Sequence, residues 1–498
     1  MSTAMSCANE DEQQRLLAIG YQRAELTMEQ LWLRYFALGG DASLMEVEAH
    51  VHGLMPLPAL QRDILAHAIN ERLDELVWRR RVPYSRTIRD SRPDAGPLAA
   101  LVTLLEGAYR EPPDRLPAVV ADAGHMLGMQ VVIYLVDYDQ RRLIPLPNRD
   151  SAGREPLGVD TSLAGRAFRL VTIVPTDAQD RPRLWVPLLD GVERLGVLDV
   201  AVPNRTDLYD PRLREQCWWL SSLLGHLVTI TTQYGDGLDT FRRQQTRTPA
   251  AELIWELLPP LTAGTETFVL AGMLQPSYAV GGDAFDYALS HTTAAMAIFD
   301  AMGHTLDAGL IAATVLAAYR SARRDGRGLY DQARAIDDTI IGQFRRGPFA
   351  TGILAELDLT TGRLRYLAAG HPHPLLLRSG KVVKTLTSGR RPPFGVDTAE
   401  LAIAEEFLQP DDWLVLHTDG ITEARNHAGD HFGQTRLIDF LEREVAAAHP
   451  PPETVRRLTQ AVMTHQDGRL QDDATVLLAQ WTPGTNKAVN MGQHHSMF

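Results

Sequence analysis

The chain has 498 residues, of which 45% are hydrophobic, and a formal net charge of −13. This length predicts about three domains of ~150 residues, each able to build an apolar core. The acidic balance argues against nucleic-acid binding and against binding to an anionic membrane surface, because both require a basic surface. Two cysteines without metal-ligand spacing, and no apolar run long enough to span a bilayer, predict a cytoplasmic protein.

Residues 1–97 are expected to form a small helical domain followed by a linker. Capping-box patterns begin at Thr27 and at Ser43, and Pro58 suits the first turn of a third helix. Three short helices with the basic cluster at 79–81 could be a helix-turn-helix. A small interaction or packing module is the better interpretation, because no set of base-reading side chains is present.

Residues 98–235 alternate helical and strand patterns and end in a long helix. The turn pair Asp190-Gly191 predicts a hairpin between two apolar strands. The order of elements, and above all the strand from Leu195 to Val200, resembles a GAF domain. That resemblance implies an α/β sensor domain with a possible small-molecule ligand. Three isolated side chains of this region are expected to be structural rather than ligands of haem or metal: His125, His226 and Cys217.

Residues 236–260 are expected to be a linker helix. Leu253, Glu256 and Leu257 fall on one helical face, and Pro259 ends the helix. A helix between a sensor and a downstream domain could carry a signal or a homodimer contact, and the alternative is a plain connector.

The third region, 261–482, contains aspartates placed beside apolar runs that read as buried strands. Unpaired buried carboxylates are costly, so several of them at one place require a cation. Oxygen ligands suit hard ions such as Mg²⁺ or Mn²⁺, and two such ions can support displacement at phosphorus. The candidate catalytic and metal-binding residues are Asp283, Asp300, Asp419 and Asp472. Asp283 and Asp300 are expected on neighbouring strands of one hairpin, close enough to share a metal.

The motifs resemble, in order, those of PP2C-like (PPM) serine/threonine phosphatases, and are most similar to the SpoIIE/RsbU branch. They are Gly281-Gly282-Asp283, Asp300-Ala301-Met302-Gly303-His304, Ala369-Gly370-His371-Pro372, Thr418-Asp419-Gly420 and Asp472-Asp473-Ala474-Thr475. The resemblance implies a multidomain α+β chain whose phosphatase domain is an α-β-β-α sandwich with two Mn²⁺ or Mg²⁺ ions.

Carried over to this chain, the resemblance implies that Asp300 bridges both ions and that Ala301 offers its backbone carbonyl. Asp419 and Asp472 would complete one metal's ligands, and Asp283 would bind directly or through water.

Other polar residues of the motifs have less definite roles. Asp286 and Asp473 either support the metal ligands or lie on the surface. His304 either acts as a general acid or holds its loop, and the second is favoured. His371 and His373 each precede proline in an extended segment and are expected to be structural.

The resulting hypothesis is a metal-dependent protein phosphatase that acts on phosphoserine or phosphothreonine. In this branch the usual partner is a phosphorylated anti-sigma-factor antagonist, and sensor and helical domains would gate the activity. Two alternatives stay open: a degenerate scaffold that only binds, and a hydrolase of small phosphate esters. Residues 483–498 are expected to be a disordered tail.

Overall fold

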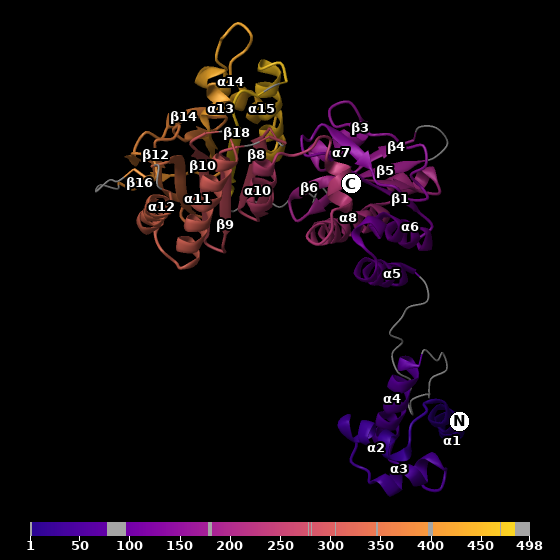
Figure 1. Cartoon of the computed structure of the whole chain (residues 1–498). Coiled ribbons are helices and arrows are strands. Elements are labelled where there is room, and N and C mark those ends of the chain that lie inside the picture. The colour runs from indigo at the N-terminus through magenta and orange to yellow at the C-terminus, as the bar shows by residue number, and fades with distance from the viewer. Residues whose placement is uncertain are drawn as a thin grey trace. The chain divides into compact units, whose positions relative to one another are not determined.

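The computed structural model describes residues 2–76, 96–177, 182–276, 278–279, 281–303, 305–344, 347–396, 402–468 and 470–483. The chain divides into two compact units, Met1–Pro93 and Asp94–Phe498, and Figure 1 shows the elements of each. The predicted tail at 483–498 lies outside the described residues apart from its first position, and His304 also lies outside them. In the part that the structure describes, no helix is both long and apolar enough to cross a membrane.

The first unit is a helical domain. Its helices are α1 (Ser2–Arg23), α2 (Met28–Ala37), α3 (Leu44–Val51) and α4 (Ala59–Glu75). Both capping boxes are confirmed, because Thr27 and Ser43 each bond reciprocally with the residue three positions later. The expectation of three helices was wrong by one. Helix α1 adds Leu17 to the buried core, and Ala24 follows directly after the helix; the polar first half of α1 gives no apolar periodicity.

The first part of the second unit, 96–235, is a six-stranded antiparallel sheet in the order β3-β2-β1-β6-β5-β4. Core residues show that α5, α6 and α8 cover one face of this sheet and that α7 covers the other. The predicted hairpin across Asp190 and Gly191 is confirmed. The strands are β1 (Gln130–Val136), β2 (Arg142–Pro145), β3 (Leu157–Gly158), β4 (Val174–Thr176), β5 (Arg183–Asp190) and β6 (Glu193–Ala201). The helices are α5 (Gly96–Arg110), α6 (Leu116–Met126), α7 (Leu163–Leu170) and α8 (Pro211–Thr232), with 3₁₀ turns at Pro113–Arg115 and Arg205–Tyr209.

We call this part the middle domain; its resemblance to GAF domains stays a prediction. Two short helices follow it, α9 (Gly237–Arg242) and α10 (Pro249–Leu257). Helix α10 is the predicted linker helix, and it packs on α11 of the next domain.

The C-terminal domain contains two six-stranded sheets. One has the order β15-β12-β11-β10-β9, with β16 paired to β12, and the other has the order β14-β13-β17-β18-β8-β7. The first sheet consists of β9 (Asp283–Leu289), β10 (Thr293–Ala301), β11 (Ala350–Asp358), β12 (Arg363–Ala369), β15 (Arg390–Arg391) and β16 (Ala404–Phe407). The second consists of β7 (Thr262–Thr265), β8 (Phe268–Gln275), β13 (Leu375–Arg378), β14 (Lys381–Thr385), β17 (Trp413–His417) and β18 (Ala474–Trp481).

Helices cover the outer faces of both sheets, which confirms the predicted α-β-β-α order of layers. On the first sheet lie α11 (Leu306–Arg324) and α12 (Leu329–Gln343); on the second lie α14 (Gly433–Ala446) and α15 (Pro451–His465), after the short α13 (Asp419–Thr422). The sheets approach closely in the middle, where a Cβ on Gly272 would lie 2.7 Å from the ring of Phe285. Helix α12 was not predicted, although Leu329, Ala333, Ile336 and Ile340 have helical spacing and are buried.

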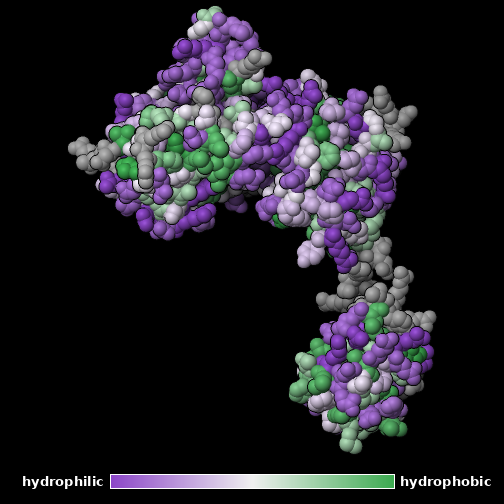
Figure 2. All heavy atoms as spheres, in the orientation of Figure 1, coloured by the Kyte–Doolittle hydropathy of each residue, from purple (hydrophilic) through white to green (hydrophobic). Residues whose placement is uncertain are grey.

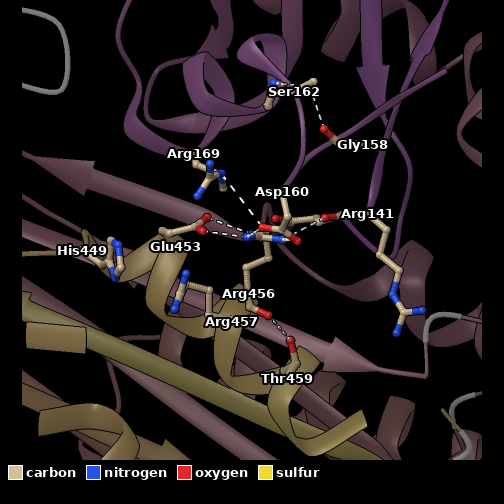
Figure 3. Close-up of polar contacts among 12 residues, drawn as sticks. Arg141, Gly158, Asp160, Ser162, Arg169, His449, Glu453, Arg456, Arg457 and Thr459 are labelled. Atoms are coloured by element: carbon tan, nitrogen blue, oxygen red, sulfur yellow. Dashed lines mark hydrogen bonds and ion pairs between the residues drawn. The ribbon is translucent and has the colours of Figure 1, made fainter. Parts of the chain in front are cut away.

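The middle and C-terminal domains share a group of charges centred on α15, part of which is shown in Figure 3. Arg456 is fully buried and donates to Glu453 at 2.7 and 2.8 Å and to Asp160 of the middle domain at 2.6 Å. Arg194 of the middle domain donates to Glu453 at 3.3 Å and to the carbonyl of Pro452 at 2.8 Å. We call Asp160, Arg194, Glu453 and Arg456 the interdomain ion cluster.

Candidate active site

The candidate site begins at the β9–β10 hairpin. Asp283 opens β9, and the antiparallel register places it directly opposite Asp300 near the end of β10. The apolar run from Ala294 to Phe299 is buried between its neighbouring strands and carries Asp300 to the end of the sheet. Opposed residues of antiparallel strands have Cα atoms about 4.5–5.5 Å apart, so the expectation that these two aspartates lie together is met.

Asp283 lies inside the sandwich. Its carboxylate oxygen Oδ2 accepts a hydrogen bond from the Thr418 hydroxyl at 2.8 Å and another from the Thr475 hydroxyl at 2.6 Å. Burial raises the pKa of Asp283 well above its usual range, and the nearby carboxylates of Asp300 and Asp473 raise it further. Both hydroxyls donate to one oxygen, so the sheets hold this side chain in a fixed orientation next to Asp300.

Asp300, Asp419 and Asp472 are more accessible to solvent than Asp283. Burial raises the pKa of Asp300 to about 7, with further contributions from the carboxylates of Asp419, Asp472 and Asp473. The pKa of Asp419 is also raised, first by burial and then by Asp472. The structure therefore brings the four predicted aspartates into one region, where neighbouring carboxylates raise the pKa values of Asp283, Asp300 and Asp419.

The glycine loop before β9 is fixed by Asp473. Its Oδ2 atom accepts hydrogen bonds from the backbone N–H groups of Gly281, Gly282 and Asp283 at 2.8, 2.7 and 3.2 Å. Asp473 is buried, so the surface alternative for this residue was wrong. A Cβ on Gly282 would lie 2.4 Å from the carbonyl oxygen of Ala301, so only glycine allows these two backbone segments to approach.

Asp286 lies away from these carboxylates. It follows Asp283 by three positions on β9, so its side chain points to the opposite face of the strand. There it is buried and pairs with Arg320 at 2.7 Å and Arg323 at 2.8 Å, both on α11. The surface alternative for Asp286 was therefore wrong as well, because this carboxylate ties β9 to the outer helix layer.

Two histidines of the C-terminal domain, His371 and His373, have surroundings that favour the neutral ring. His371 is buried, and its Nδ1 atom lies 2.8 Å from the hydroxyl of Thr351. Burial and then the neighbouring His417 lower the pKa of His371 to about 3. His373 is half-buried, and burial also lowers its pKa. These rings are neutral at pH 7, in keeping with the structural role predicted for them.

Thr418 and Thr475 were missed as contributors to the site. Each stands beside a candidate aspartate in its motif, Thr418 before Asp419 and Thr475 three positions after Asp472. A signal was therefore present in the sequence. Both hydroxyls donate to Asp283 because sheet pairing brings the three residues together, and the sequence does not show that pairing.

The donor set suits a hard divalent cation. Among the described residues, no lysine or arginine forms an ion pair with any of the carboxylates around Asp300. Oxygen-only donors of high negative charge are the ligands that Mg²⁺ and Mn²⁺ prefer. Within the described ranges, however, no three His, Cys, Asp or Glu side chains converge on a single coordination point. The chemistry of the donors fits a metal, although their side chains do not converge on one point.

Comparisons with known proteins agree on the C-terminal domain. The family model described as Stage II sporulation protein E (SpoIIE) matches residues 290–482. Protein IcfG of Synechocystis sp. is 23% identical over 283 residues, which is 50% of this chain and 43% of that protein. Phosphoserine phosphatase RsbP of Bacillus subtilis is 25% identical over 131 residues, which is 25% of this chain and 32% of that protein.

Among solved structures, the SiaA-PP2C domain of Pseudomonas aeruginosa has 21% sequence identity and a TM-score of 0.41. It covers 51% of this chain and 98% of that chain. The curated relatives named above are matched over less than half of their own lengths.

Proposed function

We propose, from the match of residues 290–482 to the SpoIIE family model, that the chain is a metal-dependent phosphatase of phosphoserine or phosphothreonine in proteins. The observation that supports the proposal most strongly is the group of carboxylates with raised pKa values around Asp300. A scaffold that only binds would gain nothing from this arrangement, since mutual repulsion makes it costly without a cation.

In this proposal Asp300, Asp419, Asp472 and the carbonyl of Ala301 would hold two Mn²⁺ or Mg²⁺ ions. When bound, the ions would neutralise charge on the phosphoryl oxygens and lower the pKa of the attacking water. Asp283 is held by hydroxyl donors on one oxygen, so its other oxygen remains for a metal or a water.

The surrounding residues position the proposed metal ligands. Asp473 fixes the glycine loop through three N–H groups, and Gly282 lets that loop lie against Ala301. The loop in turn sets the start of β9 and the position of Asp283. These contacts hold the donors without taking part in proton transfer.

For the substrate we propose a phosphorylated anti-sigma-factor antagonist, as in partner-switching signalling. Support comes from the likeness to SpoIIE and RsbP. The middle domain would gate the activity, with a small molecule or a homodimer contact as the input.

The test is phosphate release from a phosphoserine protein with and without Mn²⁺. Wild type is compared with Asp419→Asn and with Asp439→Asn, a matched change of an exposed aspartate on α14. We expect metal-dependent turnover in wild type and in the control, and a loss of about 100-fold or more in Asp419→Asn. Metal binding without turnover on any phosphorylated substrate would instead favour the scaffold, and turnover of small esters alone would favour a hydrolase of small phosphate esters.

A further inference from the structure

Exposed apolar side chains gather at one end of the α11–α12 helix pair. Figure 2 shows hydrophobic side chains on the face of the C-terminal domain where Figure 1 labels β10, β12 and α11. We call the following five exposed residues the hairpin patch: Met302, Leu306, Leu310, Ile341 and Val396. Other exposed large hydrophobic residues of this domain lie on other elements or at the opposite end of α12: Tyr330, Val383 and Phe407.

Several contacts connect the segments that carry the patch. The N–H of Met302 donates to the carbonyl of Phe349 at 3.1 Å. A Cβ on Gly395, the neighbour of Val396, would lie 2.7 Å from the side chain of Ile340 and 2.8 Å from the carbonyl of Pro348. Because a short connection joins α11 and α12, the two helices run antiparallel, and Ile341 near the end of α12 lies toward the beginning of α11.

The outward face of α11 is strongly apolar only at this end. Leu306 and Leu310 are one turn apart on the same face, and each is 46% exposed. Farther along that face the exposed or half-buried residues are small or polar: Ala313, Thr314, Ala317 and Ser321. A helix needs no leucines at positions that face water. The confinement of exposed leucines to the first two turns of α11 therefore indicates a local function.

The apolar end of α11 is also the end nearest the candidate active site. Met302 follows Ala301 directly and Asp300 by two positions, and α11 begins four residues later. A folded substrate that presents a phosphorylated side chain to Asp300 must therefore cover part of the hairpin patch. A small phosphate ester would reach the carboxylates without covering it, since Leu306 and Leu310 alone span about 6 Å along the helix.

We propose that the hairpin patch is the docking surface for the folded phosphoprotein substrate, and this inference rests on the proposed phosphatase function. The partner is a protein with apolar side chains on the surface beside its phosphoserine. Docking there would add binding energy remote from the reacting phosphorus, and the enzyme would therefore favour protein substrates over small esters.

The test compares two substrates of one enzyme: an anti-sigma-factor antagonist phosphorylated on serine, and p-nitrophenyl phosphate. The variant is Leu306→Ser with Leu310→Ser in the full chain. The matched control is Val383→Ser with Phe407→Ser, which are similarly exposed but lie on β14 and β16. Urea midpoints equal to that of wild type establish that both variants are folded.

We expect the patch variant to lower kcat/KM for the phosphoprotein about 10- to 30-fold, through a higher KM. Its kcat/KM for p-nitrophenyl phosphate should stay within about twofold of the wild-type value. The control variant should change kcat/KM for neither substrate. An equal loss on both substrates, or no loss on the phosphoprotein, would overturn the docking proposal while leaving the phosphatase in place.

Two further outcomes also decide the question. Turnover of neither substrate by metal-loaded wild type would refute the proposed function itself, and the docking proposal with it. If a second copy of the chain covers the patch, specific activity would fall with rising enzyme concentration in wild type but not in the patch variant, and the substrate-docking proposal would be wrong.

Discussion

The interdomain ion cluster can be tested by replacing Arg456 with methionine. Arg456→Met keeps most of the side-chain volume but removes the charge that bridges α15 to the middle domain. Wild-type Arg456 makes bonds of 2.6–2.8 Å to Glu453 and Asp160, and a longer bond of 3.3 Å to the carbonyl of Gln140. In the variant, Arg194 at 3.3 Å is the one charged partner that Glu453 keeps among the described residues.

The expected cost follows from the burial of each partner. Removing one member of a buried ion pair costs about 3–5 kcal/mol, because the other charge remains buried without compensation. Glu453 is 1% exposed and bears most of this cost, reduced by its remaining contact with Arg194, whereas the Asp160 side chain is 50% exposed and regains water. We therefore expect the lower end, about 3 kcal/mol, which is a decrease of about 1 M in the urea midpoint.

Arg457→Met is the matched control. Arg457 is the next residue of α15, its side chain is 37% exposed, and its partner Glu444 belongs to the same domain. Its removal should cost at most about 1 kcal/mol. Hydrogen exchange of α15 should rise in Arg456→Met and not in Arg457→Met. Unfolding free energies of the two variants within about 0.5 kcal/mol of each other would refute the view that the cluster holds the domains together.

Three other predictions concern the remaining contacts. Burial raises the pKa of Glu193 from 4.5 to about 7, so the folded state binds this proton more tightly than the unfolded state does. The stability of the protein therefore falls as the pH rises between these values. Glu193→Gln should raise the thermal midpoint at pH 8 and leave it unchanged at pH 4. Gly282→Ala should displace Ala301 and reduce phosphatase turnover about 100-fold while far-UV circular dichroism stays unchanged. Asp473→Ala leaves three backbone N–H groups without their acceptor and should cost about 3 kcal/mol in urea unfolding.

Most strands of the C-terminal domain could be predicted from the sequence, because each buried strand is a short apolar run bounded by turn residues. The pairing of Asp283 with Asp300 followed from two such runs joined by a short turn. Helix α12 shows that a signal can be present and still be missed, since its buried residues recur at helical spacing.

The different positions of Asp472 and Asp473 could not be predicted. The two residues are adjacent, yet Asp472 is exposed beside Asp300 while Asp473 is buried under the glycine loop. Alternate residues of an extended segment point to opposite sides, so the assignment depends on the residue at which β18 begins. Sequence patterns leave such boundaries uncertain by one or two residues.

The interdomain ion cluster gave no sequence signal at all. Asp160 and Arg456 are 296 positions apart, and each is an ordinary charged residue in its local sequence. Their pairing depends on the packing of two domains, which composition and periodicity do not encode.

The middle domain is connected to both halves of the candidate active site by different helices. Arg247 lies over the rings of Tyr138 and Trp255, at 4.0 and 4.9 Å, and so joins the middle domain to α10. Helix α10 packs on α11, which follows Asp300, whereas α15 of the ion cluster leads into the segment that carries Asp472. The proposed gating by the middle domain would therefore need no direct contact with the carboxylates. It would act by moving β10, which carries Asp300, relative to the segment before β18, which carries Asp472.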